Sequence, residues 1–125
     1  MEPLHIKATD LTPLIIFYPE NHELKIEGKM IPEDVENTFA PVFKWIDDYL
    51  SKNEPLHFLF RLYYYNTSAS RQFYHLFKKM DEYYAGGKKI SARWEYEEGD
   101  EESKADAEEF LNGVTFPYEI VDVSG

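Results

Sequence analysis

The sequence predicts an α/β fold: a single domain in which a mixed β-sheet of about five strands packs against three main helices. Three observations predict it. The chain has 125 residues, which suits one domain that buries about two-thirds of its unfolded surface. Aromatic residues make up 17% of the chain and gather in segments with regular apolar spacing. That spacing alternates along the chain between the period of a strand and the period of a helix. We therefore expect residues 1–125 to form one packed domain.

The first two strands are expected at residues 13–18 and 23–28. The segment between them, Pro19 to His22, has the residue types of a turn and predicts a hairpin. In the second strand, Leu24 and Ile26 lie on one face and charged residues on the other. This strand should therefore have one solvent-exposed face and lie toward a sheet edge.

A helix is expected next, because apolar residues recur every three or four positions over residues 35–50. Two starts are open. The helix could begin at Asp34 and kink at Pro41, or Thr38 could cap a helix whose first turn contains the proline. Residues 53–55 should end it.

Residues 56–65 are almost continuously hydrophobic and aromatic, which is typical of a central strand in a parallel sheet, covered on both faces. A second helix should follow, with an apolar stripe from Phe73 to Tyr84, and Gly86-Gly87 should end it.

The rest of the chain predicts two strands around a short helix. Residues 89–96 alternate as a strand, residues 101–112 form an acidic helix that should bury Ala105 and Phe110, and residues 116–123 form the last strand. Strands that alternate with helices imply parallel pairing through right-handed crossovers.

The net charge of −11 argues against nucleic acid and anionic membrane surfaces as partners, because both attract clustered Lys and Arg. Nine of the acidic residues lie between Glu95 and Glu109. Such a run forms a solvated acidic surface, a docking surface for a basic partner, or both.

Composition and spacing exclude several kinds of chemistry. The chain has no cysteine, so disulfides, thiol catalysis and thiolate metal sites are ruled out. The four histidines lack metal-binding spacing, and no Gly-x-Ser-x-Gly turn accompanies the hydroxyl residues, which argues against a metal site and a catalytic triad. No cofactor is expected. The first residues resemble neither a signal peptide nor a membrane span, so we expect a cytoplasmic protein.

The most informative stretch is residues 63–71, where the predicted central strand ends and the second helix begins. Backbone N–H groups at a helix N-terminus have no helical partner, and the helix dipole is positive there. Three roles are therefore open. Thr67 or Ser68 could cap the helix, the loop Asn66–Ser70 could bind an anion, or one of the hydroxyls could carry a phosphate.

Anion binding defines the alternative function, a flavodoxin-like module that binds phosphate or a small molecule through the loop Asn66–Ser70. Loops that hold phosphate usually contain glycine, so that the backbone can curl around the anion. This loop contains none.

A phosphate on Thr67 or Ser68 would add about −1.5 to −2 charges where the helix dipole favours them. A partner that packs on the loop would have to desolvate that charge, so modification could control binding. Thr67 would be the acceptor, and Ser68 the cap or a second acceptor. Asn66 would shape the loop, which includes Ser70, by side-chain hydrogen bonds to nearby backbone. Arg71 could pair with the phosphate.

Several short segments, in this order and spacing, resemble the SiaC family of bacterial biofilm-regulation phosphoproteins, whose fold is similar to the STAS domain of anti-sigma factor antagonists. The match extends over nearly the whole chain. The segments are Ile31-Pro32-Glu33-Asp34, Phe39 to Trp45, Tyr49-Leu50, Leu62 to Ser68, Gly86-Gly87, Arg93 to Tyr96 and Phe116-Pro117-Tyr118.

The resemblance implies a non-enzymatic signalling protein that acts through cyclic-di-GMP signalling. In that family the threonine of the Asn-Thr-Ser motif is phosphorylated, which corresponds to Thr67 here. The implied partners are a dedicated protein kinase, a PP2C-type phosphatase, and a diguanylate cyclase that the unphosphorylated form binds and stimulates.

Overall fold

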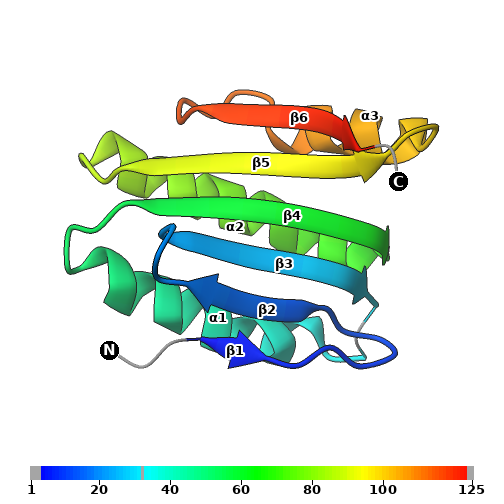
Figure 1. Cartoon of the computed structure of the whole chain (residues 1–125), viewed down its shortest axis with the longest axis horizontal. Coiled ribbons are helices and arrows are strands. Elements are labelled where there is room, and N and C mark those ends of the chain that lie inside the picture. Colours follow the sequence, from blue (N-terminus) through cyan, green and yellow to red (C-terminus); the bar gives the residue numbers. More distant parts are fainter. Residues whose placement is uncertain (1–3, 32, 124–125) are drawn as a thin grey trace.

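The computed structural model describes residues 4–31 and 33–123. Pro32 of the segment Ile31-Pro32-Glu33-Asp34, and residues 1–3 and 124–125 of the expected domain, lie outside them. Figure 1 shows a sheet with the helices packed behind it. The elements are β1 (His5–Ile6), β2 (Leu14–Tyr18), β3 (Glu23–Met30), α1 (Val35–Leu50), β4 (Leu56–Tyr65), α2 (Thr67–Ala85), β5 (Ile90–Glu97), α3 (Glu101–Phe110) and β6 (Tyr118–Val123).

The six strands of the described residues lie side by side in chain order, β1 to β6. β1–β2 and β2–β3 are antiparallel, and the later pairs are parallel. The predicted mixed sheet, hairpin and three helices are confirmed, and the short β1 adds one strand to the expected five. The prediction that β3 lies toward an edge is wrong, because β3 bonds to both β2 and β4.

The strand order explains why one sheet face is uncovered. Every crossover from β3 onward moves one strand in the same direction, so right-handed connections place α1, α2 and α3 on one face (Figure 1). The prediction that β4 is covered on both faces is therefore wrong. It is central and parallel as predicted, but His57, Tyr63 and Tyr64 are exposed.

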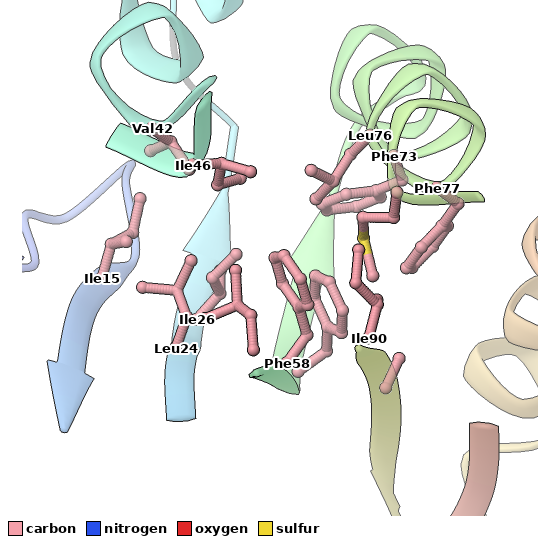
Figure 2. Close-up of a cluster of buried hydrophobic side chains, with 14 of the residues drawn as sticks. Ile15, Leu24, Ile26, Val42, Ile46, Phe58, Phe73, Leu76, Phe77 and Ile90 are labelled. Carbon is pink, nitrogen blue, oxygen red and sulfur yellow. The ribbon is translucent and has the colours of Figure 1, made fainter. Parts of the chain in front are cut away.

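The core lies between the helices and the covered sheet face. In Figure 2, Val42 and Ile46 of α1 and Phe73 of α2 point toward strand residues such as Ile26 and Phe58. All five are almost completely buried. Burial of this kind contributes about 1.5–3 kcal/mol for each large apolar side chain, so it holds the helices firmly against this face of the sheet.

The helices settle one question that the sequence left open and correct one prediction. Asp34 caps α1, as in the first of the two predicted starts, and its carboxylate accepts a hydrogen bond from the Asn37 N–H at 3.2 Å. Pro41 therefore lies inside the helix, on its exposed side, where solvent can satisfy the carbonyl that the proline leaves without a donor. In α3 the predicted burial of Ala105 is wrong. Ala105 is exposed, and Ala107 is buried together with Phe110.

Candidate functional site

The site begins with a β-bulge near the carboxyl end of β4. Leu62 pairs with Gly28 of β3, but the next pair is Tyr64 with Lys29, so Tyr63 is the extra residue. An extra residue interrupts the alternation of side chains between the two faces. Tyr63 and Tyr64 are consequently both exposed, whereas Tyr65 is half-buried. The aromatic run thus serves a surface as well as the core.

Tyr65 joins the covered side through aromatic packing. Its ring lies 5.7 Å from that of Phe73, 6.1 Å from that of Trp94 and 6.2 Å from that of Phe110. These contacts link the end of β4 to α2, β5 and α3. The residue that directly precedes the candidate loop is therefore held by three elements.

Asn66 caps α2, which corrects the expectation that Thr67 or Ser68 would do so. Its backbone is extended, with φ −96° and ψ 179°, and its side-chain oxygen accepts a hydrogen bond from the Ala69 N–H at 2.9 Å. Its main-chain carbonyl accepts a hydrogen bond from the Ser70 hydroxyl at 3.2 Å. Asparagine is among the preferred cap residues. The prediction that Asn66 orders this loop through side-chain bonding is confirmed.

With Asn66 as the cap, Thr67 and Ser68 are the first two residues of α2, and both are exposed. Ser70 is half-buried, and Arg71 is exposed one turn after Thr67. Within the described residues, no hydrogen bond involves the Thr67 hydroxyl and no ion pair involves Arg71. The structure therefore brings these residues together in one helical turn and leaves the threonine hydroxyl free.

A recess of about 400 Å³ lies beside Thr67. Its walls are residues 63–67, Ser70 and the first half of α3 with its cap residue. The α3 side contributes Asp100, Glu102 and Asp106. Three carboxylates set acceptors and negative charge opposite the positive end of α2. The recess thus offers an anion fewer converging donors than a phosphate-binding pocket requires.

Polar contacts hold α3 against this recess. The Tyr65 hydroxyl donates a 2.5 Å hydrogen bond to Asp106, and the Trp94 indole N–H donates one to Ser103 at 3.0 Å. Burial, followed by the bond to Asp106, raises the pKa of Tyr65 above its ordinary value. Asp100 caps α3 by accepting from the Ser103 N–H at 3.1 Å. Sequence reasoning missed the Tyr65–Asp106 and Trp94–Ser103 pairs, because only the fold brings β4 and β5 against α3.

The described residues do not support a metal site or a histidine-activated hydroxyl. They contain no group of three or more His, Asp or Glu side chains arranged to hold a metal ion. His75 lines a separate recess with Phe43, Gln72 and Lys79, away from the walls around Thr67. Within residues 4–31 and 33–123, no helix is long and apolar enough to cross a membrane.

Comparison with known proteins gives consistent matches over almost the full chain. The family model described as "SiaC family regulatory phosphoprotein" matches residues 6–123. The structure of SiaC of Pseudomonas aeruginosa is similar, with a TM-score of 0.89, 31% sequence identity, and coverage of 98% of this chain and 100% of that one.

A second similar structure is of the diguanylate cyclase SiaD in complex with its activator SiaC from the same organism. It matches with a TM-score of 0.90 and 31% identity, over 96% of this chain and 99% of that one. An uncharacterized protein of Pseudomonas aeruginosa strain UCBPP-PA14 is 32% identical over 121 residues, which are 96% of each chain.

Proposed function

The chain belongs to the SiaC family of regulatory phosphoproteins, and from this premise we propose that it is a non-enzymatic signalling protein whose binding to effectors depends on reversible phosphorylation of Thr67. The observation that carries the proposal is the free, exposed hydroxyl of Thr67 in the first turn of α2, beside the end of the central strand. Ser68 is the secondary acceptor, because it is equally exposed. The whole chain, residues 1–125, acts as one SiaC-like domain in the cytoplasm.

The proposed partners are a protein kinase, a PP2C-type phosphatase and an effector. A diguanylate cyclase is the proposed effector, because the similar SiaC protein is the activator of the cyclase SiaD. The unphosphorylated form would bind and stimulate it. Neither nucleic acid nor a membrane is a proposed partner, since the net charge of −11 opposes both.

The surroundings of Thr67 suit a reversible charge switch. A phosphate there would sit at the positive end of the α2 dipole and within one turn of Arg71. The same phosphate would face the carboxylates of Asp100, Glu102 and Asp106 across the recess. Attraction from α2 and repulsion from α3 oppose one another, so the modified state need not disrupt the fold. It would change what can pack on the loop.

The alternative is a flavodoxin-like module that binds phosphate or a small molecule at Asn66–Ser70. Such folds bind ligands where the strand order reverses and helices on opposite faces diverge. In this sheet the order does not reverse, and the adjacent recess is rich in carboxylates. Both observations favour the phosphorylation switch.

The deciding experiment combines peptide mapping of the protein from its native host with binding assays on variants. Mapping should locate phosphate on Thr67. Thr67→Ala should bind the cyclase as the unphosphorylated protein does, and Thr67→Asp should lose binding. Ser68→Ala is the comparison variant, because it removes the secondary acceptor: phosphorylation-dependent binding that survives in Ser68→Ala but is lost in Thr67→Ala assigns the switch to Thr67. If Thr67→Asp and Thr67→Ala both bind like the wild type, the switch is wrong.

A further inference from the structure

We infer that Tyr63, Tyr64 and the carboxylates beside them form a docking surface for an arginine-bearing segment of the effector protein. This inference deepens the proposed function and rests on it, because it gives the chemistry of the partner that Thr67 controls. Three features of the described residues carry it: two exposed aromatic rings, two adjoining recesses, and a set of carboxylates without basic partners.

The two tyrosines are the most exposed large hydrophobic residues of the described chain. Tyr63 is 55% exposed and Tyr64 61% exposed, against 42% or less for Leu11, Tyr74 and Tyr118. The bulge in β4 places both rings outside, directly before the cap of α2. Exposed neighbouring aromatics contribute much of the binding energy at protein interfaces, since they bury a large area at a small entropic cost.

Two recesses meet at Tyr63, and Tyr64 lines one of them. The recess beside Thr67 shares Tyr63 and Asp100 with a second recess of about 600 Å³ on the uncovered side of the sheet. Together they form a continuous concave surface around the ends of β4 and β5. An extended segment of a partner can therefore lie across Tyr63 and contact both recesses.

The walls of this surface carry excess negative charge. Arg61 lines it but is paired with Glu95 and Glu27. Among the residues that the structure describes, none of the other carboxylates of the two recesses forms an ion pair. They are Glu97, Glu98, Asp100, Glu102 and Asp106.

Arginine is the side chain that can contact both the exposed tyrosine rings and the unpaired carboxylates. Its planar guanidinium stacks on a tyrosine ring and at the same time donates two parallel hydrogen bonds to a carboxylate. A lysine ammonium satisfies the charge but is more strongly hydrated and lacks the flat stacking surface. Complementary charge also speeds association of such a segment.

The chemistry of this surface determines how phosphorylation could release the effector. A phosphate on Thr67 adds negative charge, which by itself would strengthen attraction for arginine. Release of the effector must therefore come from exclusion: a partner that packs on the loop has to desolvate the charge at position 67, and a phosphate also fills space in the recess beside Tyr63. Measuring effector binding at low and high salt separates the two contributions. Salt screens the attraction between arginine and the carboxylates, but it does not change the exclusion of the partner from the loop.

The test uses isotope-labelled, unphosphorylated full-length protein, followed by NMR. It is titrated with a short capped peptide of alternating arginine and serine, and with the matching lysine and glutamate peptides. We expect the arginine peptide to shift signals of Tyr63, Tyr64 and the N-terminal turn of α3. It should bind more tightly than the lysine peptide, and the glutamate peptide should not bind.

Two triple variants of equal net charge provide the control. The first removes surface carboxylates of the proposed site: Glu97→Gln, Glu98→Gln and Glu102→Gln. The second removes exposed carboxylates remote from the two recesses: Glu20→Gln, Glu54→Gln and Glu82→Gln. Surface charge pairs are individually weak, so we expect the first triple to lower arginine-peptide affinity about tenfold at low salt, and the second to lower it much less.

Equal losses in both triples would mean unspecific attraction by the whole acidic chain and would overturn the inference. So would shifts centred elsewhere, no binding, or equal affinity for arginine and lysine. Replacing both tyrosines, Tyr63→Ser and Tyr64→Ser, should remove the preference for arginine over lysine. The peptide result does not depend on Thr67, so a failed switch experiment with a confirmed docking surface overturns the proposed function alone.

Discussion

The Tyr65 hydroxyl donates a 2.5 Å hydrogen bond to the Asp106 carboxylate and so joins the last residue of β4 to the middle of α3. The two residues are separated by 41 positions in the chain. Tyr65 directly precedes the cap of α2, so this bond connects the acidic helix to the loop that carries Thr67. The bond therefore helps to set the distance between Thr67 and the α3-side carboxylates of the recess.

Removing this bond should destabilise the fold. In Tyr65→Phe the half-buried Asp106 carboxylate loses its donor while ring packing is preserved, and we expect the free energy of unfolding to fall by about 1–3 kcal/mol. Urea denaturation measures it. Tyr64→Phe, which removes an exposed hydroxyl, is the matched control and should change little. Equal stabilities of the two variants would show that the bond contributes nothing.

Variants should distinguish the helix-capping role of Asn66 from the phosphate-accepting role of Thr67. Asn66→Ala removes the side chain that accepts from the Ala69 N–H, and the stability should fall by about 1 kcal/mol. Asn66→Asp keeps an acceptor and should be close to the wild type. Thr67→Ala should cost much less than Asn66→Ala, although it abolishes modification. A larger loss of stability in Thr67→Ala than in Asn66→Ala would show that Thr67, not Asn66, caps the helix.

Glycine at position 28 should be required for the bulge. Gly28 has φ +126°, and an added Cβ would lie 3.4 Å from the Cα of Pro13. A side chain is strained at this φ whatever the space, so Gly28→Ala should cost about 1–3 kcal/mol. It should also shift the NMR signals of Tyr63 and Tyr64. Gly86→Ala is the control, because Gly86 has φ −82° and should tolerate the methyl group.

The stability should depend on pH through Glu95, which lies on the uncovered sheet face between two arginines. Burial raises the pKa of Glu95, but hydrogen bonds from Arg61 and Arg93 outweigh it and lower the pKa below 4.5. A depressed pKa gives stability that is complete above the unfolded value and is lost as the pH falls through the folded value. The advantage of wild type over Glu95→Gln should therefore be larger at neutral pH than at pH values well below 4.5.

The measurement for Glu95 is urea unfolding across that pH range. Glu119→Gln is the control, since Glu119 also pairs with Arg93, at 3.0 Å, but is exposed. Exposed pairs are worth little, so its effect should be small at every pH. A pH-independent difference between wild type and Glu95→Gln would show that ionisation of this group does not stabilise the fold.

Phosphorylation should create a role for Arg71. If phosphate on Thr67 pairs with this guanidinium one turn away, Arg71→Gln should destabilise the phosphorylated protein by about 0.5–1 kcal/mol and leave the unmodified protein unchanged. Thermal unfolding of both forms tests this. The same loss in both forms would indicate a structural role for Arg71 unrelated to phosphate.

Sequence reasoning predicted the elements more reliably than their surroundings. The alternation of Leu24 and Ile26, and the stripe that includes Phe73, are local patterns, and they predicted β3 and α2 correctly. The exposure of Tyr63 and Tyr64 was not predictable from the continuous aromatic run, because the bulge depends on pairing with Gly28 across the sheet. The cap lies one residue before Thr67 and two before Ser68, and the sequence does not distinguish them because Asn66, Thr67 and Ser68 are all acceptable cap residues.

By itself, the sequence determined the class of fold, the order of its strands and helices, and the junction at which Thr67 lies, because hydrophobic periodicity and turn residues act over short distances. Only the tertiary structure decided which sheet face stays open, that Asn66 is the cap, and that α3 brings Asp100, Glu102 and Asp106 opposite Thr67. Those outcomes depend on crossover direction and strand register, which join residues far apart in the chain.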